Sequence, residues 1–594
     1  SDNNLHIFGS GRNIQNHTHR RIRKRSRDCS GIMMKRFILL AILIPLNAWA
    51  TSYCVKPDGT ATVKTNAVVA NAAAGTAIAT ASQALSLAGV NGVTTFTGGD
   101  TVYFSAKNTS GVDANYTAQL TIASSGSSTS SRLTYQGIAD GTAGAFPVIV
   151  NTGNTDGVSW GAYSYVTLDG FTIAPSTSDA SHSAIGFWGG AKTSSVISHI
   201  SVNTTGMTGS GGKGIYGSTS QFIGLTISDV TVTMGSGSAS QTYPMYFIGS
   251  SGARGSNITL TNITLTNGTK SVFNYIDGLN TNGVTVSGAS DTSTGGIGFL
   301  YFGGSVDINN TTITNAAGVY VSNSALTAHS KIRNITATGH LGKAVYIANS
   351  SSNIDISNGS FSAAPLSSGD IYADTSTNIS ISDSVSDGTF SSCYLNNVQN
   401  ASIKKTVCKN SKGHCFEVAH ASSNNITFDR LLAINGGTKT ATNLGLGFVV
   451  HDAKNVSIRD VIAVNMVEGG IALLGTSSGS VYNSFFLKNG GAWSTDGGGK
   501  LDSVQAGWWI DASGSWTIKN NYSGQNYPRE FTGTGSNISI DYNAYYPISQ
   551  SNFYAGGSFS AWKALNRDAH SLATIYDFQN WARQGGGLMK HISK

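Results

Sequence analysis

The chain has 594 residues, with 72 glycines but only 8 prolines, and 11% of its residues are charged, against about 25% in an average globular protein. The net charge of +7 arises within residues 1–50, which carry nine Lys or Arg and two Asp, and this leaves 28 basic and 28 acidic residues in 51–594. The balance gives no argument for a basic surface patch, so we expect no nucleic-acid partner.

Residues 1–50 are predicted to be a basic upstream extension followed by a signal peptide. A basic start at Met33–Arg36 precedes an apolar run from Phe37 to Leu46, and Ala48-Trp49-Ala50 supplies a small-residue cleavage site. The run is shorter than the roughly 20 residues of a membrane span. We therefore expect cleavage after Ala50, bacterial export to the medium or the cell surface, and no transmembrane span in the mature chain.

Residues 51–150 are predicted to form an N-terminal cap and the first strands. A short helix is expected within Asn66–Ala88, and Gly99–Phe104 is expected to be the first strand. Residues 151–546 carry a repeat, and 547–594 form a C-terminal cap and tail with a helix near Ser560–Leu565. Caps of this kind cover the strand edges that a repeat protein would otherwise expose at its two ends.

One phrase recurs throughout residues 151–546. It consists of an apolar residue, any residue, a residue that tolerates positive φ, then apolar, any and apolar, and most successive copies lie 22 to 25 residues apart. Clear copies begin at Leu260, Ile308, Ile332, Ile356, Ile381 and Ile403. Such a period predicts an all-β fold, a single-stranded right-handed parallel β-helix with three strands per coil. Asn at the third position fits a tight bend and can hydrogen-bond from coil to coil.

A family resemblance lies in three places. It is carried by Tyr53–Gly59 with Gly99–Tyr103, by Tyr165–Gly170, and by an ending that combines Asp541–Asn543, Trp562 and Asp568–Ser571. Together these segments resemble bacterial right-handed parallel β-helix proteins of the pectate-lyase-like superfamily. The resemblance spans nearly all of 51–575. It implies the fold but no single reaction, because that superfamily includes lyases, hydrolases, epimerases, phage tailspikes and adhesins.

The strand before each phrase is predicted to point alternate residues outward. The candidate substrate-binding residues on this face are Tyr320, Tyr346, Tyr372, Tyr394, Trp509, Asp374, Asn396 and Asp511. Four successive tyrosines, one per coil, would form a ladder on which sugar rings stack. Tyr216 and Tyr246 are expected to extend this row towards the N-terminus. The alternative is a ladder of stacked tyrosines that only stabilises the sheet.

Glu417 is the leading catalytic candidate because it follows the tyrosines in the same row, and only three glutamates occur in 51–594. The candidate catalytic residues are Glu417, His420, His414, His451, Lys439 and Lys500. A carboxylate beside histidines can transfer protons, and the two lysines come from long insertions at Gly436–Leu446 and Asn489–Ala506. A shift of one residue would pair Cys415 with Cys393 and turn Glu417 inward, which we disfavour because it buries an unpaired charge.

Cysteines and metals leave alternatives open. A disulfide among Cys393, Cys408 and Cys415 is compatible with the sequence, without a preferred pairing, and the alternative is that these residues pack as buried thiols; Cys54 is the fourth cysteine of the exported part. Calcium is a conceivable cofactor through Asp374, Asp452 or Asp511, but no cluster fixes a site.

We predict an exported β-helix that binds a polysaccharide along its tyrosine-lined face, with lyase or hydrolase activity left open. The alternative is a non-catalytic adhesin or glycan-binding β-helix.

Overall fold

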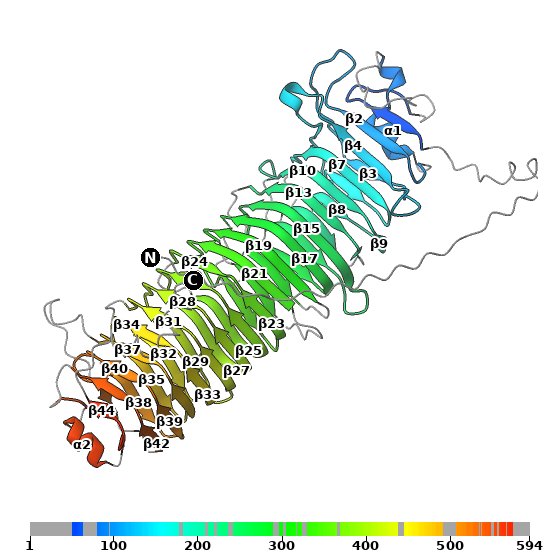
Figure 1. Ribbon diagram of the computed structural model, residues 1–594. Coiled ribbons are helices and arrows are strands. Elements are labelled where there is room, and N and C mark those ends of the chain that lie inside the picture. Colours follow the sequence, from blue (N-terminus) through cyan, green and yellow to red (C-terminus); the bar gives the residue numbers. More distant parts are fainter. Residues whose placement is uncertain are drawn as a thin grey trace, which may run out of the picture. The chain divides into compact units, whose positions relative to one another are not determined.

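The computed structural model describes part of the chain, all of it within one compact unit that begins at Ala50 (Figure 1). The described residues are 50–573 without 63–79, 94–95, 177–181, 208–211, 219–221, 236–241, 289–295, 301–304, 317, 323–329, 365–368, 438–444, 491–505, 534, 536, 548–551, 555–556 and 566. The expected leader, residues 1–50, lies outside them except for Ala50.

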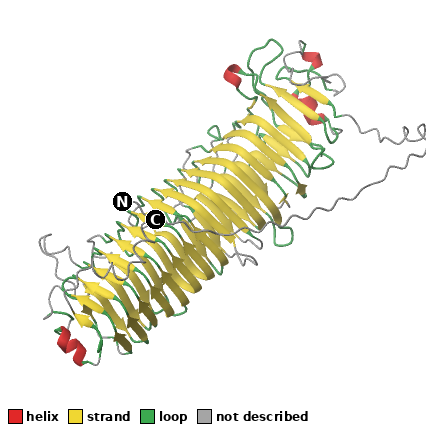
Figure 2. Ribbon diagram, viewed as in Figure 1, coloured by secondary structure: helices red, strands yellow, loops and turns green. Residues whose placement is uncertain are grey.

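The described residues form a parallel β-solenoid of about 13 turns, in which coil follows coil in chain order (Figures 1 and 2). Every pairing between its named strands is parallel, and these strands lie in three sheets, with a single long strand passing from one sheet to the next in some coils. The predicted all-β parallel β-helix is therefore confirmed. No helix in the described part of the chain is long and apolar enough to cross a membrane.

The three sheets are named here by position in the coil. The tyrosine sheet contains β3 (Leu120–Ile122), β6 (Val158–Trp160), β8 (Ser183–Phe187), β11 (Lys213–Ser218), β14 (Tyr243–Ile248), β16 (Lys270–Asn274), β18 (Gly296–Leu300), β20 (Val319–Ser322), β22 (Val345–Ala348), the first parts of β25 (Gly369–Ser382) and β27 (Ser391–Lys404), then β29 (Phe416–Ala419), β32 (Leu446–His451), β35 (Gly469–Gly475), β38 (Ala506–Ala512) and β41 (Phe531–Thr532). The phrase sheet contains β1 (Ser52–Val55), β2 (Thr101–Ser105), β4 (Leu133–Ile138), β7 (Val166–Ile173), β9 (Lys192–Thr193), β10 (Val196–Asn203), β12 (Phe222–Ile223), β13 (Thr226–Thr233), β15 (Gly255–Thr266), β17 (Ile276–Ser287), β19 (Val306–Thr314), β21 (Ser330–Thr338), β23 (Ser352–Ser357), the second parts of β25 and β27, then β30 (Asn424–Asp429), β33 (Lys454–Arg459), β36 (Gly479–Tyr482), β39 (Trp516–Lys519) and β42 (Ile538–Asp541). The closing sheet contains β5 (Val148–Ile149), the last residues of the longer phrase-sheet strands from β7 to β21, then β24 (Ser360–Ser362), β26 (Val385–Asp387), β28 (Val407–Lys409), β31 (Leu432–Ile434), β34 (Ile462–Val464), β37 (Phe485–Leu487), β40 (Tyr522–Gly524), β43 (Ala544–Tyr546) and β44 (Leu572–Ala573).

The bend between the phrase sheet and the closing sheet lies at the third position of the repeated phrase. Asn262, Asn310 and Asn334 adopt φ values of 53°, 51° and 55° there, a conformation that Asn tolerates better than most residues. The side-chain amide of Asn358 donates to Asn334 Oδ1 of the preceding coil at 3.2 Å. Both features predicted for this position are confirmed.

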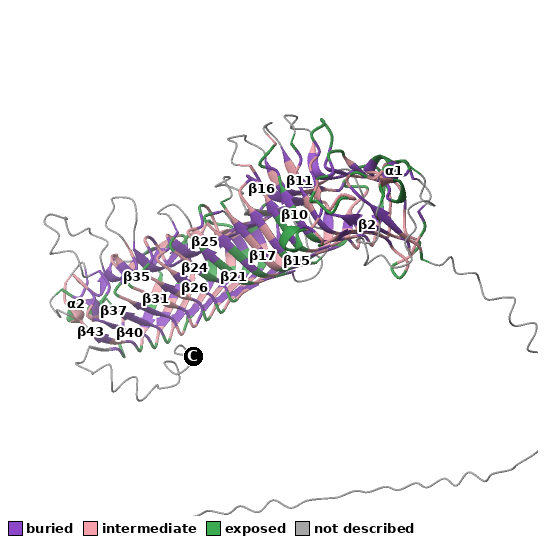
Figure 3. Cartoon of the chain, turned by 90° about the horizontal axis from the view of Figure 1, so that it is seen from above, coloured by how far each residue is buried: buried purple, intermediate pink, exposed green. Residues whose placement is uncertain are grey.

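Buried residues recur along the whole described solenoid (Figure 3), and their side chains pack into one continuous core cluster. Ile332, Ile356 and Ile381 lie directly opposite one another on successive coils, and each is at most 1% exposed. Because register is kept from coil to coil, the same apolar positions meet repeatedly. The outward positions are thereby held in equally regular rows.

The ends differ from expectation at the N-terminus and agree at the C-terminus. The first strand is β1 rather than Gly99–Phe104, and it pairs with β2. It is short because Pro57 follows within two residues. The described N-terminal helix is α1 (Leu87–Gly92), with 3-10 turns at η3 (Ala81–Gln83) and η4 (Thr142–Gly144), whereas most of the helix expected within Asn66–Ala88 lies outside the described residues. Helix α2 (Phe559–Ala564) matches its prediction.

Candidate functional site

Four tyrosines form a row along the outer face of the tyrosine sheet. Tyr320, Tyr346, Tyr372 and Tyr394 lie directly opposite one another on successive coils. Consecutive ring centroids are 4.9, 5.1 and 5.0 Å apart, with ring planes tilted by 49° to 57°. Each side chain is partly exposed. We call these four residues the tyrosine row.

A lysine lies over the middle of the tyrosine row. Lys343 Nζ is 4.6 Å from the ring centroid of Tyr346 and 4.9 Å from that of Tyr372. Burial lowers the pKa of Lys343, and the charge of Asp374 acts in the opposite direction. The sequence analysis did not single out this lysine. Its position three residues before Tyr346 is the only local signal for it.

The phenol groups of Tyr346, Tyr372 and Tyr394 remain protonated at neutral pH. Burial raises the pKa of Tyr346 and Tyr372 to about 12, and it also raises the pKa of Tyr394. Neighbouring phenols and Asp374 add smaller contributions in the same direction. The row therefore keeps its hydroxyl donors together with its apolar ring faces.

Asp374 and Asn396 lie beside the tyrosine row at the next outward position. They are opposite each other on β25 and β27, and the Asn396 amide donates to Asp374 Oδ1 at 2.9 Å. The Thr375 hydroxyl donates to the same oxygen at 3.1 Å. Asp374 is therefore a hydrogen-bond acceptor held in place beside the tyrosine row, and its charge contributes to the raised pKa of Tyr346 and Tyr372.

Glu417 continues the tyrosine row on the next coil. It lies opposite Tyr394 on one side and Val449 on the other. Cys393 pairs with Phe416, so the alternative register that would turn Glu417 inward does not occur. Within the described part of the chain no hydrogen bond or ion pair holds its carboxylate. Burial without such a partner raises the pKa of Glu417 to about 7, so it can give or take a proton at neutral pH.

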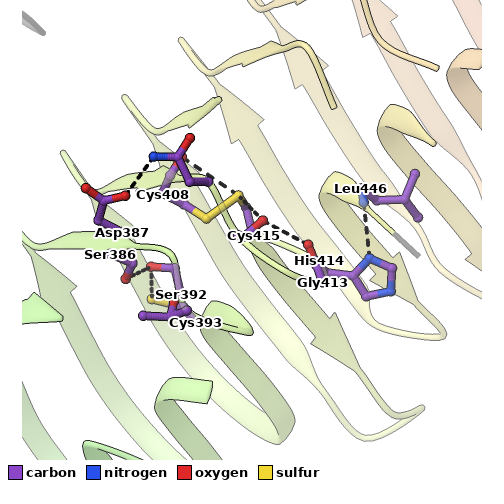
Figure 4. The surroundings of a disulfide bond; sticks show 12 residues. Ser386, Asp387, Ser392, Cys393, Cys408, Gly413, His414, Cys415 and Leu446 are labelled. Atoms are coloured by element: carbon purple, nitrogen blue, oxygen red, sulfur yellow. Dashed lines mark hydrogen bonds between the residues drawn. A yellow bond between two sulfur atoms is a disulfide. The ribbon is translucent and has the colours of Figure 1, made fainter. Parts of the chain in front are cut away.

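His414 is hydrogen-bonded to the backbone of a neighbouring coil. Its Nδ1 accepts a hydrogen bond from the Leu446 N–H at 3.3 Å (Figure 4). Burial lowers the pKa of His414 to about 4, so the ring is neutral at pH 7. Its observed interaction positions the start of β32.

His420 directly follows β29 and His451 is the last residue of β32, and both are exposed. His420 Nδ1 accepts from the Ser422 N–H at 3.2 Å, and His451 Nδ1 lies 2.9 Å from a carboxylate oxygen of Asp452. Among the described residues neither ring forms a hydrogen bond or an ion pair with Glu417. The structure therefore does not join the three expected histidines and Glu417 into one hydrogen-bonded cluster.

The C-terminal continuation of the row is apolar. Glu417 is followed by Val449, Ala472 and Trp509 at the same position. Val449 and Ala472 are 4% and 0% exposed. They form a cluster with Leu446, separate from the core, against which Leu474 and Trp509 pack. We call these five residues the apolar cluster.

The remaining candidates on this side are less connected to the row. Asp511 is exposed and lies opposite Leu474. Lys439 and Lys500 lie outside the described residues. Across the described ranges, no group of three or more His, Cys, Asp or Glu side chains is arranged to hold a metal ion. Calcium binding through Asp374, Asp452 or Asp511 therefore gains no support from a ligand cluster.

A disulfide anchors the segment that leads to Glu417. Cys408 at the centre of β28 is bonded to Cys415, two residues before Glu417, with the two Cα atoms 5.7 Å apart (Figure 4). Cys393 and Cys54 are buried free thiols. The sequence left the pairing open. Tertiary structure decides it, because Cys393 faces Phe416 rather than Cys415 across the sheet.

Comparison with known proteins finds similarity of structure but not of sequence. No protein-family model and no curated protein matches this chain. Similar solved structures include a GH136 lacto-N-biosidase from Eubacterium ramulus, with 9% identity over 80% of this chain and 67% of that one and a TM-score of 0.29. A mannuronic acid specific polysaccharide family 6 lyase from human gut microbiota has 9% identity over 84% and 94%, with a TM-score of 0.19. Tailspike protein 3 of bacteriophage CBA120 has 11% identity over 76% and 55%, with a TM-score of 0.23. At these values the similarity identifies no reaction or substrate for this chain.

Proposed function

We propose that this protein binds a linear polysaccharide along the tyrosine row. The observation that carries the proposal is the row itself, four partly exposed rings about one coil apart with centroids 4.9 to 5.1 Å from their neighbours. Sugar rings present C–H faces that pack on aromatic rings, and the protonated phenols supply donors at their edges. Asp374 and Asn396 add polar groups of both kinds beside the rings.

We further propose that Glu417 is the acid–base group of a cleavage reaction. It stands at the end of the tyrosine row, and burial raises its pKa to about 7, where proton exchange at neutral pH is most efficient. In a hydrolase, protonated Glu417 would give its proton to the glycosidic oxygen as the C1–O bond breaks, a water oxygen would bond to C1, and the proton lost by that water would return through solvent to the Glu417 carboxylate. In a lyase, ionised Glu417 would remove the C5 proton next to the uronate carboxylate, the C4–O bond would break as the C4=C5 double bond forms, and the leaving oxygen would take a proton from water.

A non-catalytic glycan-binding protein is the second candidate function. It is favoured by one observation, that no His, Lys, Arg, Asp or Glu side chain of the described residues forms a hydrogen bond or an ion pair with Glu417. In that case the polysaccharide would bind along the same tyrosine row without being cleaved.

We propose that this activity is exercised outside the cytoplasm. The Cys408–Cys415 disulfide supports an oxidising compartment, as does the signal peptide predicted from residues 1–50. A bulky linear polysaccharide is also a substrate met at or beyond the cell surface.

Binding is tested by substitution of single rings in the full chain. Each of three substitutions should weaken polysaccharide binding by about 1 kcal/mol, roughly five-fold in Kd, on the scale of aromatic contacts. They are Tyr346→Ala, Tyr372→Ala and Tyr394→Ala. Tyr482→Ala, on the phrase sheet, is the matched control. Titration calorimetry and thermal melting are measured together. Variants that melt early but bind normally would show that the row only stabilises the sheet.

Catalysis is tested with Glu417→Gln, which keeps the shape of the side chain and removes its ionisable group. We expect binding to remain and product release to be abolished. Formation of unsaturated uronates, followed by absorbance, identifies a lyase, and saturated reducing ends identify a hydrolase. Unchanged turnover in Glu417→Gln would contradict the role of Glu417, and binding without turnover in the unsubstituted protein would establish the non-catalytic alternative.

A further inference from the structure

A second aromatic cluster lies on the same row, several coils before the tyrosine row. Gly186, Tyr216 and Tyr246 lie directly opposite one another on β8, β11 and β14. The rings of Tyr216 and Tyr246 are stacked, with centroids 5.5 Å apart and planes 16° apart. Trp188, whose ring centroid is 5.3 Å from that of Tyr216, is 38% exposed. We call Trp188, Tyr216 and Tyr246 the N-terminal cluster.

The tryptophan of this cluster is held in place by a buried carboxylate. The Trp188 indole N–H donates to Asp156 Oδ2, and Asp156 is only 3% exposed. The backbone N–H and hydroxyl of Ser183 donate to the other oxygen of Asp156 at 2.8 and 2.9 Å. A Cβ on Gly186 would collide with the Asp156 carboxylate and the Trp188 indole nitrogen. The absence of a side chain at this position therefore makes room for the contact.

A lysine also braces the backbone behind Trp188. Lys192 Nζ donates to the carbonyl oxygens of Trp188, Gly189 and Gly190 at 3.0, 3.2 and 3.0 Å, and the residue is 1% exposed. Burial lowers the pKa of Lys192 to about 8, which leaves it mostly charged at pH 7. The N-terminal cluster therefore has a pre-organised ring and a positive charge beneath it.

In the N-terminal cluster, as in the tyrosine row, a lysine ammonium group lies over a tyrosine ring. Lys213 Nζ is 4.6 Å from the ring centroid of Tyr216, the same distance as Lys343 Nζ from Tyr346. Both lysines stand three residues before their tyrosine, in Lys213-Gly-Ile-Tyr216 and Lys343-Ala-Val-Tyr346. The same Lys-x-x-Tyr spacing at the same position of the coil thus puts an ammonium group over the row twice.

The two lysine–tyrosine units are aligned along the solenoid. The row runs from Tyr216 through Tyr246, Val272, Gly298 and Tyr320 to Tyr346. These five steps correspond to about 24 Å at the usual strand spacing of ~4.8 Å. One extended polymer can therefore reach both units, and a second contact on the same chain raises affinity through effective concentration.

We propose that the N-terminal cluster with Lys213 is a second subsite, which together with Lys343 and the tyrosine row binds one chain of an acidic linear polysaccharide. Its anionic groups would pair with the two ammonium groups, and its sugar faces would pack on the rings between and beside them. Asp374 acts on Lys343 electrostatically, but its carboxylate is already bonded to Asn396 and Thr375. The inference rests on the proposed polysaccharide-binding function and names the class of polymer and a second place where it binds.

The test compares oligosaccharides of different length and charge on the full chain. The probes are acidic polysaccharides (polygalacturonate, polymannuronate, polyguluronate and hyaluronan) in short and long forms, with cello-oligosaccharides as neutral chains. Lys213→Gln should weaken binding of the long acidic chain about ten-fold, within the range of avidity effects, and should reduce its salt dependence. It should leave short acidic chains at the tyrosine row unaffected.

Two further variants keep the outcome decisive. Trp188→Ala should reproduce the loss for long chains, and Lys331→Gln, an exposed lysine on the phrase sheet, should have no effect. If Tyr372→Ala weakens binding while Lys213→Gln and Trp188→Ala do not, the second subsite is wrong and the proposed function stands. Equal affinity for neutral chains, or binding to none of the acidic chains, overturns the preference for an acidic polymer. If no tyrosine-row variant affects binding, the proposed function itself fails.

Discussion

One outward row of the tyrosine sheet has two regions of opposite character. In the tyrosine row, from Tyr320 to Tyr394, the rings are partly exposed. The phenols of Tyr346 and Tyr372 stay protonated because burial raises their pKa to about 12. In the apolar cluster, at Val449 and Ala472, the side chains at the same position are almost fully buried. Strand alternation is identical in both regions, so alternation decides only the direction of a side chain. Its exposure depends on what the neighbouring residues place over it.

Glu417 stands where these two regions meet. Tyr394 lies on one side of it and Val449 on the other. An apolar neighbour and a large ring both remove water from the carboxylate, and neither donates a hydrogen bond to it in the structure. This boundary position accounts for the raised pKa of Glu417. The comparison between the two regions can be tested by the following substitutions.

The largest expected effect comes from a charge placed in the apolar cluster. Val449→Asp would put a carboxylate among Leu446, Ala472 and Trp509, and we expect a loss of about 3 kcal/mol because no described partner can compensate for its burial. Tyr346→Asp, at the same position in the exposed region, should cost only about 1 kcal/mol. Hydrogen exchange in the surrounding coils measures both. Equal losses would mean that the two regions do not differ in burial.

Removal of the disulfide should have an intermediate effect and tests the anchoring of the boundary. Cys408→Ser with Cys415→Ser opens a loop of seven residues, and we expect a loss of about 2 kcal/mol from the unfolded-state entropy of such a short loop. Urea denaturation with and without reductant checks this value. Cys393→Ser is the control. Because Cys393 is a free thiol, reductant should change the denaturation of this variant by the same amount as it changes that of the parent protein. A double variant as stable as the parent would show that β28 and β29 need no covalent link.

The smallest effect concerns the pH dependence that Glu417 adds to stability. Its pKa is raised from 4.5 to about 7 in the folded state, so the folded protein holds this proton more tightly than the unfolded chain does. The contribution to stability is therefore greatest at low pH and is lost as pH rises from about 4.5 to 7. Since the side chain is partly exposed, we expect Glu417→Gln to gain on the order of 1 kcal/mol at pH 8 and almost nothing at pH 4.

Measurement of the difference between the parent and Glu417→Gln is needed because buried Glu530 also has a pKa raised to about 7 by burial. Its contribution is common to both proteins and cancels in the difference. Parallel stability curves from pH 4 to 8 would mean that Glu417 is fully hydrated. In that case the boundary between the two regions would not perturb it.

The amino-acid sequence by itself determines the scaffold of this protein and the direction of its rows. A period of 22 to 25 residues with Asn at the bends predicts stacked coils, because each copy of the repeat buries its apolar side chains only against the neighbouring copies. The order Tyr320, Tyr346, Tyr372, Tyr394 and Glu417 follows from the same period. Local spacing is sufficient for these features since every coil repeats one register.

Only tertiary structure decides which groups meet between coils and what covers them. Spacing could not choose the partner of Cys415, place Lys343 over two rings, or show that Val449 and Ala472 are covered while Tyr346 is not. Nor could it separate His414 from Glu417. These properties depend on contacts between side chains of different coils, and on the loss of water around them, which the repeat period of the sequence does not specify.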